Sequence, residues 1–216
     1  MHHPHYDRIP ELDDERNLIE VRVSDLQPTQ MCVGMAEVRA RQRDFSQESS
    51  KGRLDDLRGK PVPLVRNQLG ELWMVDRHHR MRALLEMDAD VTTYGYVIAV
   101  LESDSRDAAL LALQERGWLY LHDGRGNGPL EPSTLPQSLL GLDDDPYRSL
   151  IWKLKSEGLI KPQPLIPYHE FRWGAWLRTR PLPPFSSAQL NPALPVSRKL
   201  AQSKAAAHLA GWTGKS

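Results

Sequence analysis

Five consecutive polar residues are the strongest candidates for chemistry in this sequence: Asp76, Arg77, His78, His79 and Arg80. They lie between an apolar, strand-like run and a helical pattern. The first turn of a helix has unpaired N–H groups and a partial positive charge, so cations placed there are normally unfavourable. A bound phosphate removes this conflict, because it compensates the dipole and accepts hydrogen bonds from arginine and histidine. We therefore predict a phosphate-binding corner held by Arg77, His78, His79 and Arg80.

Other interpretations of the same segment stay open. Asp76 can be an ordinary helix N-cap, with the basic side chains facing water. It can also orient His79 or bind a metal such as Mg²⁺, which makes Asp76 and His79 candidates for catalysis and Asp76 a candidate metal ligand. A metal ion shared by His78 and His79 is disfavoured, because neighbouring helical side chains point about 100° apart.

Three further residues are candidates around this corner. Glu37 can act as a general base, although an ion pair with Arg41 at i+4 is the simpler interpretation. Gln30 and Lys60 can bind phosphate oxygens. The simpler interpretations are an amide that closes a turn for Gln30 and an exposed lysine for Lys60.

The hydrophobic pattern predicts the elements that position these residues. The apolar runs on either side of Asn67-Gln68-Leu69-Gly70 predict a hairpin, and the phosphate corner follows directly after it. The expected elements are a strand over 18–24, a helix over 34–45, a helical turn near 54–57, a hairpin over 62–75, a helix to 87, a strand over 91–101 and a helix over 103–116.

The composition limits the class of protein. Of the 216 residues, 40% are hydrophobic, enough for one large domain or for a domain with a small second lobe. Lys+Arg and Asp+Glu both total 28, so no global basic field attracts a nucleic acid. The single cysteine excludes an intramolecular disulfide. With no signal-peptide pattern and no apolar stretch of about 20 residues, we expect a cytoplasmic protein without a membrane partner.

Four segments are expected along the chain. Residues 1–17 predict a flexible N-terminal arm, and residues 18–122 form the domain that carries the corner. Residues 123–137 are rich in glycine and proline, and this composition predicts a linker loop. Residues 138–216 predict a helical lobe with a proline-rich segment.

Three helices are expected in this lobe. Asp145 is a good N-cap for the first, the second covers 168–179, and an alanine-rich third covers 196–210. Arg148 and Glu170 can project into the cleft between the lobe and the preceding domain.

Three segments of the chain resemble the ParB/sulfiredoxin superfamily, and in particular its subfamily of ParB-like nucleases. The superfamily places a Gly-Glu-Arg-Arg or Asp-Gly-His-His-Arg type motif at such a corner, followed by Arg-Ala; residues 76–83 read Asp-Arg-His-His-Arg-Met-Arg-Ala. Residues 25–34 and two stretches within residues 144–173 fit the subfamily. The resemblance covers residues 18–180. It implies an α+β fold, a ParB/sulfiredoxin-like small mixed sheet with helices, followed by a C-terminal helical lobe.

The resemblance also implies a function. Members use this corner for CTP hydrolysis in chromosome partitioning, phosphoryl chemistry in sulfiredoxins and phosphoryl transfer in free-serine kinases. We therefore expect a nucleotide- or phosphate-binding protein that hydrolyses a phosphoester or phosphoanhydride, with a nucleotide or other phosphorylated ligand as partner and Mg²⁺ as a cofactor. The alternatives are a non-catalytic binding module switched by a nucleotide and a DNA nuclease. The balanced charge and the lack of a carboxylate cluster argue against the nuclease.

The sequence departs from the superfamily pattern at three points. The usual glycine of the corner is Arg77 here, which adds a cation. The segment Thr29-Gln30 stands where serine kinases carry a catalytic acid, which weakens a kinase assignment. The pair His78-His79 stands where sulfiredoxins have their cysteine, so a redox role for Cys32 is disfavoured.

Overall fold

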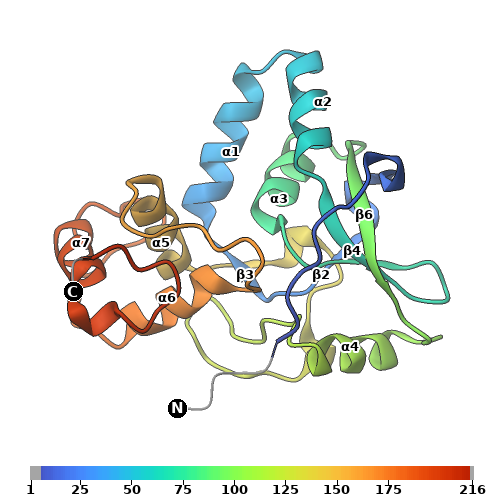
Figure 1. The fold of residues 1–216 in the computed structure, drawn as a ribbon. Coiled ribbons are helices and arrows are strands. Elements are labelled where there is room, and N and C mark those ends of the chain that lie inside the picture. Colours follow the sequence, from blue (N-terminus) through green and yellow to red (C-terminus); the bar gives the residue numbers. More distant parts are fainter. Residues whose placement is uncertain (1–5, 215–216) are drawn as a thin grey trace.

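A five-stranded mixed sheet forms the centre of the protein, whose computed structural model describes residues 6–214 (Figure 1). The strand order is β1-β6-β4-β5-β2. The strands are β1 (Ile19–Arg22), β2 (Leu26–Pro28), β4 (Val62–Arg66), β5 (Leu72–Met74) and β6 (Thr92–Val100). The β4–β5 pair is antiparallel, which confirms the predicted hairpin, whereas β2 pairs with β5 and β4 pairs with β6 in parallel.

Seven helices surround this sheet in the described part of the chain. In Figure 1, α1 and α2 project at the top and α4 lies at the bottom. Helices α5, α6 and α7 cluster at the left of the view. The helices are α1 (Met35–Gln47), α2 (Ser50–Gly59), α3 (His78–Met87), α4 (Arg106–Glu115), α5 (Pro146–Ser156), α6 (His169–Arg178) and α7 (Leu194–Gln202). The predicted α+β architecture is therefore confirmed.

Apolar side chains pack into three clusters. One lies between the sheet and helices α1 and α3, where Val38, Phe45 and Leu84 are buried. A second lies between the opposite face of the sheet and α4. The third is formed by α5, α6 and α7 around Trp173, and it also contains Trp176. Both tryptophans are therefore core residues.

A two-stranded parallel sheet joins the start of α1 to the start of α5. Its strands are β3 (Cys32–Val33) and β7 (Asp143–Asp144). The side chain of Asp145 accepts hydrogen bonds from the first turn of α5, which confirms it as the N-cap. The N-terminal ends of α1 and α5, which are far apart in sequence, therefore lie side by side.

The ends of the chain differ from the expected pattern. Residues 1–5 of the predicted flexible arm lie outside the described residues. In the rest of the arm Ile9 is buried, and the Trp118 indole donates to the carbonyl of Asp7, so this part packs on the main body. The last helix was predicted to reach residue 210 but ends at Gln202, because the chain turns at Ser203 and buries Ala206. The division of the chain into domains stays a prediction.

No helix in residues 6–214 is both long and apolar enough to cross a membrane.

Gly34 allows α1 and α5 to approach closely, which gives a first prediction. A Cβ atom at this position would lie 2.7 Å from the backbone nitrogen of Ser149. We expect Gly34→Ala to lower the free energy of unfolding by about 1–3 kcal/mol, because the two helices must move apart. Urea denaturation measures this change.

The control for this prediction is Gly59→Ala, because a Cβ atom there meets nothing within 4 Å. We expect the control to stabilise the protein by up to about 1 kcal/mol. Equal unfolding midpoints for the two variants would contradict the close approach of α1 and α5.

Candidate functional site

A cavity of about 180 Å³ lies at the predicted corner. It is bounded by the N-terminal ends of α3 and α6, by α1 and α5, and by the loop of residues 162–167. Its charged lining comprises five cationic and three acidic side chains: Arg41, Arg77, Arg80, Arg148 and Lys155, with Glu37, Asp76 and Glu170. The cavity is therefore biased toward an anionic ligand.

The backbone at the corner takes an unusual conformation. Arg77, not Asp76, is the N-cap of α3, and its φ of 74° lies in the left-handed region. An N-cap role for Asp76 was one of the open interpretations; among the described residues its Oδ1 accepts from the adjacent Arg77 N–H, at 2.7 Å. Arg77 stands at the position of the usual glycine, and the positive φ explains why glycine suits it. Burial raises the pKa of Asp76, which also lines the cavity.

In both histidines of the corner, the Nε2 atom of the ring accepts a hydrogen bond from a backbone N–H group of another segment. The Nε2 atom of His78 accepts from the Thr29 N–H at 3.1 Å, and the Nε2 atom of His79 accepts from the Gly34 N–H at 2.9 Å. These bonds require neutral rings with the proton on Nδ1. Burial lowers the pKa of His78, and burial together with the charge of Arg148 lowers that of His79 to about 3. The hydrogen bond from Gly34 positions the His79 ring, and no hydrogen bond joins Asp76 to His79 among the described residues.

Arg80 and Lys60 both pair with Asp56, a residue that does not line the cavity. The Arg80 guanidinium contacts Asp56 of α2 and lies 5.1 Å from the centre of the Phe45 ring. Lys60 also pairs with Asp56 and does not line the cavity. Gln30 does line it, while its amide nitrogen donates to the carbonyl of Cys32 at 2.6 Å. The structure thus brings all the predicted phosphate ligands except Lys60 to the cavity.

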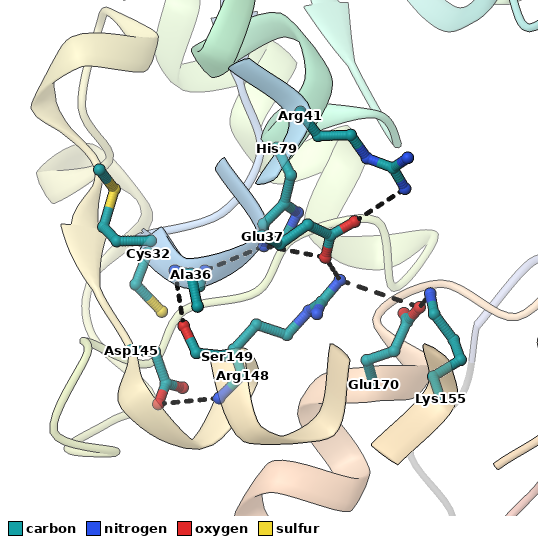
Figure 2. A network of polar contacts seen from close by, with 12 residues as sticks. Cys32, Ala36, Glu37, Arg41, His79, Asp145, Arg148, Ser149, Lys155 and Glu170 are labelled. Atoms are coloured by element: carbon teal, nitrogen blue, oxygen red, sulfur yellow. Dashed lines mark hydrogen bonds and ion pairs between the residues drawn. The ribbon is translucent and has the colours of Figure 1, made fainter. Parts of the chain in front are cut away.

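A chain of alternating charges crosses the cavity from α1 to α6 (Figure 2). Glu37 lies 3.3 Å from Arg41, as the i+4 spacing suggested, and 3.0 Å from Arg148. Arg148 lies 3.8 Å from Glu170, which also contacts Lys155. The chain begins and ends with a cation, so three cations face two carboxylates. Arg148 and Glu170 project into the cleft as expected.

The two carboxylates in this chain of alternating charges, Glu37 and Glu170, are ionised. Burial by itself raises the pKa of Glu37, but the surrounding positive groups lower it further than burial raises it, to about 2. Those groups are Arg148, Lys155 and Arg41, joined by His79 at acid pH where its ring takes up a proton. Burial also opposes ionisation of Glu170, and Arg148 with its other partners again outweighs burial and lowers the pKa. The excess of positive charge therefore persists at neutral pH.

Arg148 has donor atoms that the protein does not use. The residue is 4% exposed, and its Nε and Nη1 atoms are buried without a hydrogen-bond partner among the described residues. Arg41, Arg77 and Arg80 line the same cavity. Their Nε atoms are also buried without a hydrogen-bond partner among the described residues. An unpaired buried donor costs free energy, especially on a charged group. An anion that enters the cavity and reaches these atoms would satisfy several of them at once.

Two of the three cavity carboxylates are not free to bind a Mg²⁺ ion. Within residues 6–214 no group of three or more His, Cys, Asp or Glu side chains is arranged to hold a metal. Magnesium needs oxygen ligands that are free to coordinate it, whereas Glu37 and Glu170 are engaged by cations. Asp76 is left as a single carboxylate ligand, so the Mg²⁺ site stays a prediction that would need phosphate oxygens and water as its other ligands.

The sheet, the strand-to-helix corner and the adjoining helical lobe define a ParB-like α+β protein. Residues 19–179 match the family described as “Putative ParB-like nuclease”, and the chain belongs to this family. The crystal structure of protein Atu1540 from Agrobacterium tumefaciens is similar, with a TM-score of 0.80 and 27% sequence identity. That match covers 92% of this chain and 99% of the other. A search of curated proteins found no match.

The neutral state of His79 predicts a dependence of stability on pH. Above pH 6.5 the ring is neutral in both the folded and the unfolded chain. Below that pH the unfolded chain takes up a proton, whereas folded His79 does not until about pH 3, so stability falls with pH. We expect His79→Gln, whose side-chain oxygen can still accept from Gly34, to remove up to about 1.4 kcal/mol of this loss per pH unit.

Urea denaturation between pH 7.5 and 5 measures the difference between the wild type and His79→Gln. His208 is exposed, and His208→Gln is the control that should leave the pH dependence unchanged. Parallel curves for the wild type and His79→Gln would show that His79 titrates normally in the folded protein.

Proposed function

We propose that this protein binds a phosphate group of a nucleotide or nucleic acid in the cavity and hydrolyses the phosphoester. The observation that carries the proposal is the set of unused donors on Arg148. A group buried to this degree, with an excess positive charge and two free N–H donors, is suited to a ligand with several anionic oxygens. Membership of a family of ParB-like nucleases supports a phosphodiester as the ligand.

Phosphate oxygens would be held from two sides. The first turn of α3 supplies backbone N–H groups and its dipole, and the strained Arg77 adds a guanidinium beside them. Arg148 of α5 supplies its donors from the opposite wall, and Lys155 adds charge. Donors fixed before the ligand arrives stabilise the charge that develops on phosphate oxygens during transfer.

Asp76 is the best candidate for the general base. Glu37 is held in ion pairs, and the Nε2 atom of His79 is engaged by Gly34. Asp76 lines the cavity and has a raised pKa, which makes it a stronger base than an ordinary carboxylate. In the proposed step a water oxygen forms a bond to phosphorus while Asp76 takes one water proton. The bond from phosphorus to the leaving oxygen breaks, and that oxygen is then protonated from solvent.

The binding half of the proposal predicts the effect of Arg148→Lys. Lysine keeps a positive charge beside Glu37 but lacks the planar set of donors. We expect the affinity for inorganic phosphate to fall about tenfold or more, as for the loss of a charged hydrogen bond. Titration calorimetry measures the affinity.

Arg198→Lys is the matched control, because Arg198 pairs with Glu157 through two bonds of 2.8 Å and does not line the cavity. Its phosphate affinity should equal that of the wild type. If the two lysine variants bind phosphate equally well, Arg148 does not bind the ligand and the proposal fails.

The catalytic half of the proposal predicts the effect of Asp76→Asn. Asparagine keeps an oxygen that can accept from the Arg77 N–H but cannot take a proton from water. We expect the turnover number to fall by a factor of about 10²–10⁴, while phosphate affinity does not weaken. In the wild type, activity should rise with pH as Asp76 loses its proton.

The substrates for this test are an oligonucleotide, a nucleoside triphosphate and bis(p-nitrophenyl) phosphate, each supplied with Mg²⁺. The control is Asp88→Asn, at the exposed far end of α3. Undiminished turnover in Asp76→Asn would exclude Asp76 as the base. A wild-type protein that binds phosphate but cleaves none of these substrates would be a binding module.

A further inference from the structure

A second hollow lies on the other side of α6 from the charge chain. Its volume is about 690 Å³, which is in the range of small-molecule sites. One face of α6 forms one wall, and Gly117 and residues 119–122 with Gly126 and Pro129 form the other. We call this hollow the α6 groove.

The residues that α6 contributes are spaced as one face of a helix. Phe171, Arg172, Ala175, Arg178 and Thr179 follow each other at intervals of one, three, three and one residues. Together with the opposite wall they give a lining of aromatic rings and cations. No carboxylate contributes to it among the described residues.

Two polar groups of the groove are not saturated by hydrogen bonds or ion pairs within the described residues. The Nδ1 atom of His122 is buried with no hydrogen-bond partner in the described part of the chain. Arg172 has no carboxylate partner within residues 6–214; its guanidinium lies 4.5 Å from the centre of the Tyr6 ring. Arg178, by contrast, is held by Asp145 at 2.8 Å. Among the described residues, the groove thus carries a cation without a carboxylate partner, Arg172, and a buried ring nitrogen without a hydrogen-bond partner, in His122.

The groove and the phosphate cavity share a wall. Tyr168 and Phe171 line both. The ring of Tyr120 stacks on Phe171 with 4.0 Å between ring centres and 22° between planes. Phe171 is buried beneath this stack, so a ligand whose anionic end occupies the cavity can place an attached flat group against the half-buried ring of Tyr120.

We infer that the α6 groove binds the base of an unpaired nucleotide whose phosphate occupies the cavity, an inference that rests on the proposed function. A nucleobase has a flat apolar face for the aromatic rings and a polar edge for His122 and Arg172. Aromatic rings with nearby arginines are the usual platform for single-stranded nucleic acid.

The charge distribution agrees with this ligand. Residues 138–216 contain eleven Lys and Arg but five Asp and Glu, so the part of the chain that carries α6 is basic although the whole chain is neutral. The basic charge would attract the phosphates next to the bound base. The substrate class is thus a strand with unpaired bases.

Filling the groove tests this inference. Ala175 is exposed on the groove face of α6, so Ala175→Trp would occupy the space without disturbing the core, and Ala175→Leu would do so with less bulk. Ala108→Trp, at an exposed position of α4, is the matched control. The ligands are a short oligothymidylate and a strand of equal length without bases, compared by fluorescence anisotropy. Urea denaturation confirms that each variant is folded.

We expect the wild type and Ala108→Trp to bind oligothymidylate about tenfold or more tightly than the baseless strand. Both Ala175 variants should lose most of this preference yet bind the baseless strand as the wild type does. Equal affinity of the wild type for the two strands, or a preference that survives in both Ala175 variants, would overturn the inference and leave the phosphate site intact. Failure of the wild type to bind either strand or inorganic phosphate would overturn the proposed function as well.

Discussion

The buried ion pair between Glu37 and Arg148 joins the two parts of the site. It links α1 to α5 over 3.0 Å, and both residues are almost fully buried. Removing two charges from water is costly, and their attraction repays this only when the remaining donors and acceptors are also satisfied. Here they are not, because two donors of Arg148 have no partner among the described residues. The protein thus keeps a partly unsatisfied cation between segments that are far apart in sequence.

This arrangement would couple the binding of an anion to the fold. An anion beside Arg148 would supply the missing acceptors, and it would do so only when α1, α3 and α5 are already assembled. A ligand that binds the folded chain and not the unfolded one adds to stability by mass action. The histidines contribute differently: His78 and His79 fix the start of α3 against Thr29 and Gly34, and so position the helix N-terminus.

The local elements of this fold could be predicted from the sequence, whereas the directions of side chains could not. The β4–β5 hairpin and the Asp145 cap depend on neighbouring residues, and both were confirmed. The partner of Arg80 was not predictable, because Asp56 lies on another helix and only packing brings the two together. Arg148 was recognised as a residue facing the cleft, but its unpaired donors depend on burial, which a single charged residue in a helical pattern does not reveal.

The positions of strained backbone also indicate this cavity, independently of the charges that line it. Among the described residues, only Arg77 and Tyr168 combine a side chain with a positive φ, of 74° and 54°. Each begins a helix, α3 or α6, and each lines the cavity. The left-handed conformation costs a residue other than glycine about 1–2 kcal/mol, and such strain concentrates at functional sites. Glycine would relieve it at either position but would remove a guanidinium or a ring from the wall. The chain therefore accepts strain at two positions whose side chains line the cavity.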